Sequence, residues 1–174
     1  GPHTGNAKDF TSFEQLWDAF EKQVDYFLNI KIRGNLVIEK IYAEEMPVPF
    51  LSILTNDCIA RGKDYNAGGA RYNTSYIQGV GIGTITDCMA VVKYNVWDEK
   101  RFSMAELQNA MLDNFVGHNL IYNLVCNKTP KYGNDDDYAD DLMKKIFALY
   151  HDKVTGIKNN RGGTYRINML PTTC

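Results

Sequence analysis

The feature that most constrains the fold is a glycine-rich stretch that leads into an apolar run, over residues 63–98. A segment with strand chemistry, residues 71–77, is followed by three glycines at alternate positions: Gly79, Gly81 and Gly83. Glycine has no Cβ, so it permits positive φ angles and lets another backbone or a ligand approach closely. The stretch therefore predicts a tightly packed loop that feeds a buried helix.

A nucleotide-binding loop is the alternative interpretation of these glycines, and their spacing argues against it. A dinucleotide fingerprint reads G-x-G-x-x-G. After Gly79 and Gly81 the third place holds Thr84, and after Gly81 and Gly83 it holds Thr86. A P-loop needs Gly-Lys followed by Ser or Thr, and the sequence contains no such run.

The charge and the distribution of apolar residues argue against two classes of partner. The formal net charge is −2 and the Lys and Arg residues are scattered, whereas nucleic-acid binding needs clustered cations that neutralise phosphates. No apolar run reaches about 18 residues, the length that spans a membrane. Residues 1–10 are polar and do not form a signal peptide. We therefore expect a cytoplasmic protein with neither a nucleic-acid nor a membrane partner.

Cysteine and aspartate patterns predict no metal site. Cys58, Cys88 and Cys126 lie in apolar helical patterns and form no C-x-x-C pair, so we expect them to be buried and reduced. Cys174, at the end of the sequence, has no such pattern around it. The acidic run 134–137 does not match a calcium-binding EF-hand loop. It is instead typical of a helix N-terminus, where carboxylates meet unpaired N–H groups.

Helical spacing of apolar residues predicts a long first helix over residues 11–46, with Gly34 as the point where it would break. Thr11 and Ser12 are N-cap residues, with Glu and Gln at capping-box distance. The residues expected on its apolar face are Phe13, Leu16, Trp17, Phe20, Val24, Phe27 and Leu28, continued by Leu36, Val37, Ile41 and Met46.

The spacing of apolar residues and the positions of glycines and capping residues predict four more elements. A second helix is expected over residues 50–60, ended by Gly62. A helix over residues 84–97 is apolar on so much of its surface that it must be buried. Ser103, with Glu at the box position, starts another helix. The double glycine before residues 164–170 marks a turn into a strand.

Three segments, in this order, resemble the glycyl radical enzymes of the pyruvate formate-lyase-like family: GGARYNTSYIQGVGIGTITD at 68–87, PKYGNDDDYAD at 130–140 and RGGTYRINMLPTT at 161–173. The resemblance covers nearly the whole chain, from Asp9 onward. It implies a chain that is mainly α with a few short strands (α/β). Residues 1–174 would then be a single partial domain, a fragment of the family's ten-stranded α/β barrel.

The family's reactive residues do not occur in this sequence. Its members carry a catalytic Cys in a G-C-x-E loop and a radical-bearing Gly in an R-V-x-G-Y/F-like segment, and neither motif occurs here. We therefore expect no catalytic residue in this chain and no turnover by the chain alone. Its expected role is to build a wall that keeps water and oxygen from a radical formed elsewhere.

The resemblance also implies a reaction for the full-length protein. The segments YNTSYIQGVGIGTITD and YRINMLPTTC are most similar to those of the members that remove water from trans-4-hydroxy-L-proline. Implied partners are that small molecule, an activating enzyme that installs the glycyl radical with S-adenosylmethionine and an iron–sulfur cluster, and a second subunit in a homodimer. The alternatives are a decarboxylase or C–C lyase acting on an aryl acetate or 2-oxo acid, or a non-catalytic interaction module. Such a module should bury its own helices, whereas a slice of a barrel should expose apolar faces.

Thr172 and Thr173 are the substrate-binding residues that the resemblance implies. In the family, the strand that corresponds to residues 164–170 ends facing the substrate. A threonine hydroxyl both donates and accepts a hydrogen bond, which suits a hydroxylated or carboxylated substrate. The alternative is an ordinary pair of threonines at the end of a strand.

Overall fold

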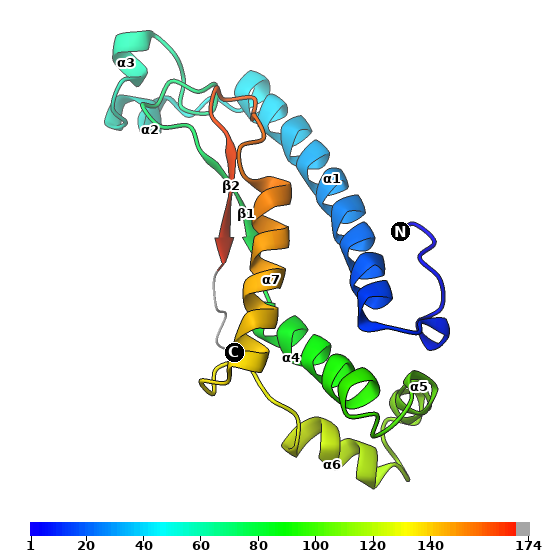
Figure 1. Ribbon diagram of the computed structural model, residues 1–174. Helices are drawn as coiled ribbons and strands as arrows, with labels where there is room; N and C mark the ends of the chain where they lie inside the picture. The colour runs from blue at the N-terminus through cyan, green and yellow to red at the C-terminus, as the bar shows by residue number, and fades with distance from the viewer. Residues whose placement is uncertain (170–174) are drawn as a thin grey trace. The chain divides into compact units, whose positions relative to one another are not determined.

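The computed structural model describes residues 1–169 (Figure 1). Contacts divide the described chain into two compact units, one formed by residues 1–23 and 80–149 and the other by residues 24–79 and 150–169. The secondary structure is mainly helical with one two-stranded parallel sheet, as the sequence predicts. That residues 1–174 form a single partial domain stays a prediction.

Helix α1 (Phe13–Glu45) is continuous through Gly34, so the predicted break is wrong. No atom lies within 4 Å of the place a Cβ at Gly34 would take. A single glycine costs a helix only about 1 kcal/mol, too little to interrupt one of this length. The predicted N-terminal caps are confirmed, since Gln15 N donates to Ser12 Oγ at 3.4 Å and Gln15 Oε1 accepts from Thr11 N at 2.9 Å.

All regular elements of the described part of the first unit are helices. They are η1 (Ala7–Asp9), the first part of α1, α4 (Ile82–Val92), η2 (Lys93–Asp98), α5 (Met104–Leu112), α6 (Asn119–Asn127) and the first part of α7 (Asp137–Val154). The capping box predicted at Ser103 is present in full. The acidic run 134–137 does lead into a helix, α7. The main hydrophobic core of the first unit consists of Phe13, Trp17, Met89, Ala90, Leu142 and Ile146.

The buried helix predicted over 84–97 is confirmed, but its second half differs in form. After Val92 the chain continues as the π-helix η2. Asn95 in this turn is fully buried, and its amide donates to Val91 O at 2.9 Å and Thr129 Oγ1 at 2.8 Å. A single π-helical turn is too short for the spacing of apolar residues to distinguish it from an α-helix.

The second unit contains the strands. The single helix predicted over 50–60 is instead two short helices, α2 (Pro49–Leu54) and α3 (Cys58–Arg61), separated at Asp57, whose φ is 77°. Gly62 ends α3 with a φ of 57°, as predicted. The first strand, β1 (Ser75–Gly79), begins later than residues 71–77 suggested, and it pairs in parallel with β2 (Tyr165–Met169).

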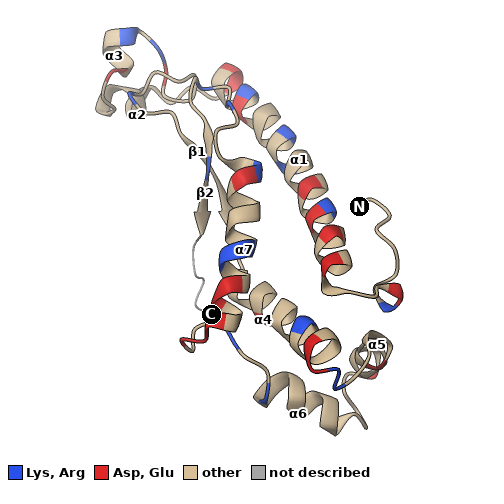
Figure 2. Ribbon diagram, in the orientation of Figure 1, with Lys and Arg blue, Asp and Glu red and all other residues tan. Residues whose placement is uncertain are grey.

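Several predictions of burial were wrong. Cys58 is buried, but Cys88 and Cys126 are exposed, and Phe27 is 56% exposed. Helices α2 and α6 contain no buried residue. Figure 2 shows charged residues along α1 and α7, whereas α6 contains none. The spacing identified helices, but which apolar residues find a partner depends on what packs beside them. No helix within residues 1–169 is long and apolar enough to cross a bilayer.

Candidate substrate-facing surface

The β1–β2 pair carries the candidate site, because parallel strands in α/β folds place ligands beyond their carboxyl ends. Both strands run in the same direction (Figure 1), with Ser75 opposite Tyr165 and Gly79 opposite Met169. Thr172 and Thr173, which the sequence predicts as substrate contacts, follow β2 but lie outside the described residues. Their role stays a prediction.

One face of this pair is packed. Ile77 is 3% exposed and Tyr165 is fully buried. They form a cluster with Leu28 and Ile32 of α1 and Val154 of α7. Because side chains alternate across a strand, this packing decides which residues point the other way.

The opposite, open face carries four polar side chains in two cross-strand pairs. Tyr76 stands opposite Arg166, and Gln78 opposite Asn168. Tyr76 is 56% exposed, and Gln78 and Arg166 are exposed as well. Their side chains bond to no other residue of the described chain. Sequence reasoning missed these four residues, although the alternation in SYIQG and YRINM would have identified them.

The glycines of the opening stretch have structural roles. A Cβ at Gly79 would overlap the Met169 sulfur, and one at Gly83 would come within 3.5 Å of the Tyr132 ring. Gly81 is the N-cap of α4, with a φ of 83°. Gly79 needs glycine for this close approach and Gly81 for its positive φ, whereas a Cβ at Gly83 would make an ordinary contact. Both constraints agree with a packed loop and not with a nucleotide loop.

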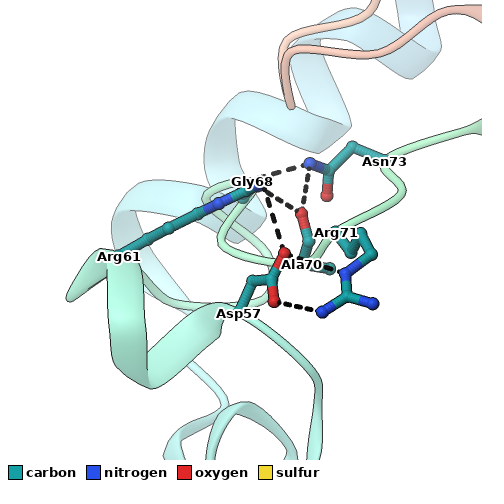
Figure 3. Close-up of polar contacts among 6 residues, drawn as sticks. All are labelled: Asp57, Arg61, Gly68, Ala70, Arg71 and Asn73. Atoms are coloured by element: carbon teal, nitrogen blue, oxygen red, sulfur yellow. Dashed lines mark hydrogen bonds and ion pairs between the residues drawn. The ribbon is translucent and has the colours of Figure 1, made fainter.

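The polar loop before β1 is held by its own side chains (Figure 3). Arg71 binds Asp57 through two hydrogen bonds of 3.0 and 2.8 Å. Asn73 Nδ2 donates to the backbone oxygens of Gly68 and Ala70, at 3.1 and 2.9 Å. The Arg71 hydrogen bonds lower the pKa of Asp57 below its usual range. These contacts hold the segment before β1 in place, so we interpret it as a structural support for the strand.

A recess of about 310 Å³ in the first unit is lined in part by Lys93 and Tyr138. Both side chains donate hydrogen bonds to Asp98, which does not line the recess: Lys93 Nζ at 2.7 Å and Tyr138 OH at 2.8 Å. Burial, and then the Asp98 carboxylate, raises the pKa of the Tyr138 phenol. In the part of the chain up to Met169, no group of three or more His, Cys, Asp or Glu side chains is placed to hold a metal ion.

The chain belongs to the pyruvate formate lyase-like family, which matches residues 1–174. Trans-4-hydroxy-L-proline dehydratase of Clostridioides difficile is 58% identical to it over 174 residues, 100% of this chain. (2S)-3-sulfopropanediol dehydratase of Klebsiella oxytoca is 40% identical over 166 residues, 95% of this chain. The chain spans only 22% and 20% of the lengths of these two relatives.

The solved structures that resemble this fold are also glycyl radical enzymes. The crystal structure of hydroxyproline dehydratase from Clostridioides difficile with trans-4-hydroxy-L-proline bound matches with a TM-score of 0.95 and 57% identity, over 99% of this chain and 22% of that one. A glycyl radical enzyme from Archaeoglobus fulgidus matches with a TM-score of 0.83 and 34% identity, over 91% of this chain and 20% of that one. The described fold is therefore a fragment of the glycyl radical enzyme barrel.

Proposed function

We propose that this chain is part of a glycyl radical lyase that removes water from trans-4-hydroxy-L-proline. The observation that carries the proposal is the 58% identity, over the whole chain, to a dehydratase of that amino acid. The exposed apolar helices α2 and α6 support a chain that packs inside a larger barrel rather than a self-contained interaction module.

The reactive residues belong to parts of the enzyme outside these 174 residues. An activating enzyme that uses S-adenosylmethionine and an iron–sulfur cluster would form the glycyl radical. The radical would pass to a cysteine, whose thiyl abstracts a substrate hydrogen atom. The substrate radical would then lose water and take a hydrogen atom back from the cysteine thiol, which gives pyrroline-5-carboxylate and restores the thiyl. The residues of this chain would bind and orient the substrate and keep bulk water out.

Within this proposal, Thr172 and Thr173 contact the substrate, and Thr172 has the stronger claim. In the family that the chain resembles, the position directly after the proline contacts the substrate, and in this sequence Thr172 holds that position. Its hydroxyl suits the hydroxyl or carboxylate of a hydroxylated amino acid. We also propose a cytoplasmic homodimer, as the resemblance implies.

The test is anaerobic activation of the full-length protein, followed by incubation with trans-4-hydroxy-L-proline. Mass spectrometry should detect pyrroline-5-carboxylate, and the 174-residue chain alone should form none. Isethionate, (2S)-3-sulfopropanediol and indoleacetate serve as competing substrates, because relatives act on them. Release of carbon dioxide from indoleacetate, with no dehydration of hydroxyproline, would favour the decarboxylase alternative. The relative of that kind is only 26% identical.

A further inference from the structure

Glu39 of α1 joins the first residues of both strands. Its Oε1 accepts hydrogen bonds from Ser75 Oγ at 2.5 Å and from Tyr165 OH at 3.0 Å. Its Oε2 accepts from Asn160 N, in the loop before β2, at 3.0 Å. Ser75 and Tyr165 are also cross-strand partners, so one carboxylate ties together the two ends from which the parallel pair is built.

Asn159 makes a second link at the same end of the pair. This residue is 8% exposed. Its Nδ2 donates to Ser75 Oγ at 2.9 Å and to Asn73 O at 2.6 Å, and its Oδ1 accepts from Gly163 N at 2.7 Å. Asn159, Ser75, Glu39 and Tyr165 therefore form one connected network.

The pattern of apolar residues does not exclude a shift of β2 by two residues relative to β1. A slip of one residue would turn the apolar residues of β2 outward, and burial forbids it. A slip of two residues keeps every side chain on its own face, since Tyr165, Ile167 and Met169 share parity. It would move β2 by about 6.6 Å along its axis. The hydrophobic pattern alone does not exclude this slip, so specific polar or packing contacts must do so.

We propose that Glu39 is the positioning residue that excludes the two-residue slip and so selects the observed register. After such a slip, the residue opposite Ser75 would be Ile167 or Gly163, and neither has a side-chain donor. The Tyr165 phenol, fully buried, would lose its acceptor, and a buried donor without an acceptor is costly. Burial and the Glu39 carboxylate raise the pKa of Tyr165, which keeps this donor protonated.

The consequence for catalysis rests on the proposed function. Thr172 and Thr173 come three and four residues after Met169 in the sequence, so a change in the register of β2 would reach them through the chain. Glu39 would then act on substrate binding through the strand, with no substrate contact of its own.

The test measures register directly, by disulfide formation between cysteines placed on the open face of the full-length protein. The pair Tyr76→Cys/Arg166→Cys is opposite in the observed register. The pairs Tyr76→Cys/Asn168→Cys and Gln78→Cys/Arg166→Cys are opposite only after a slip of two residues in one direction or the other. Diagonal Cα atoms lie roughly 8 Å apart, which a disulfide cannot bridge. Peptide mass mapping assigns each bond, so natural cysteines need not be removed.

We call Tyr76→Cys/Arg166→Cys the matched pair and the other two the slipped pairs. With Glu39 present, the disulfide yield of the matched pair should be at least tenfold higher than that of either slipped pair. In the Glu39→Ala background, the disulfide yield of one slipped pair should rise at least tenfold. Glu39→Gln should restore the matched preference, because its amide oxygen can still accept from Ser75 and Tyr165. The matched control is Glu44→Ala on the same helix, an exposed carboxylate 3.9 Å from Lys40, which should change nothing.

A folded Glu39→Ala protein that keeps the tenfold matched preference would overturn the proposal. If Glu39→Ala does not fold, Tyr165→Phe decides, because it removes only the hydroxyl. A shift toward a slipped pair then supports the proposal, and an unchanged preference rejects it. Since the readout needs no turnover, the result stands whether or not hydroxyproline is the substrate.

Discussion

Gly79 lies opposite Met169 at the carboxyl ends of the parallel pair, with the Met169 thioether in the space that a side chain at position 79 would need. Tyr150 also lies within 3.2 Å of that space, and its hydroxyl donates to Gln78 O at 3.2 Å. The absence of a side chain at one residue thus allows the strand ends to close beside the candidate site.

Gly79→Ala should therefore destabilise the protein, by about 1 kcal/mol. The cost is modest because the end of the Met169 side chain can rotate away. Thermal unfolding of the purified protein measures it. An unchanged unfolding temperature would mean that the strand ends are looser than the structure shows.

Gly163→Ala should cost more, roughly 2–3 kcal/mol. A Cβ there would overlap the backbone oxygen of Asn73, and a backbone atom cannot rotate away as a thioether can. Gly34→Ala is the matched control. It fills open space in the middle of α1, so it should stabilise by about 0.5–1 kcal/mol. Chemical denaturation of both variants should give shifts of opposite sign.

Asp57→Asn should flatten the loss of stability at acid pH. A carboxyl whose pKa is lowered in the folded state stabilises the fold above its unfolded pKa, about 3.9, and this contribution disappears as pH falls through the folded value. Arg71 lowers the pKa of Asp57. The unsubstituted protein should therefore unfold at a higher temperature than Asp57→Asn near pH 6, and the two unfolding temperatures should converge toward about pH 2.5.

Asp18→Asn is the control for that comparison, since Asp18 is an exposed residue of α1 with no partner in the described chain. If it flattens the acid profile as much as Asp57→Asn does, the Arg71–Asp57 pair is not the cause.

Thr172→Val should lower kcat/KM for trans-4-hydroxy-L-proline by roughly tenfold, the value of about one hydrogen bond, mainly through KM. Valine keeps the shape of threonine and removes only the hydroxyl. Thr173→Val should have a smaller effect, because the resemblance places the substrate contact directly after the proline, at Thr172. Steady-state kinetics of the activated full-length enzyme decides. A larger effect at Thr173 would reverse the assignment.

The sequence by itself determined several helix ends and the family. Capping at Ser12 and Ser103, the end of α3 at Gly62 and the helix after the acidic run depend on side chains only a few residues away, so local chemistry specifies them. The three family segments, which are patterns of residue identity, likewise needed no coordinates.

Only the tertiary structure decided which faces are used. The open face of Tyr76, Gln78, Arg166 and Asn168, the exposure of Cys88 and Cys126, and the joining of Ser75 and Tyr165 by Glu39 all depend on residues that are distant in sequence. Burial and strand register come from such distant contacts, and periodicity along a single segment does not contain them.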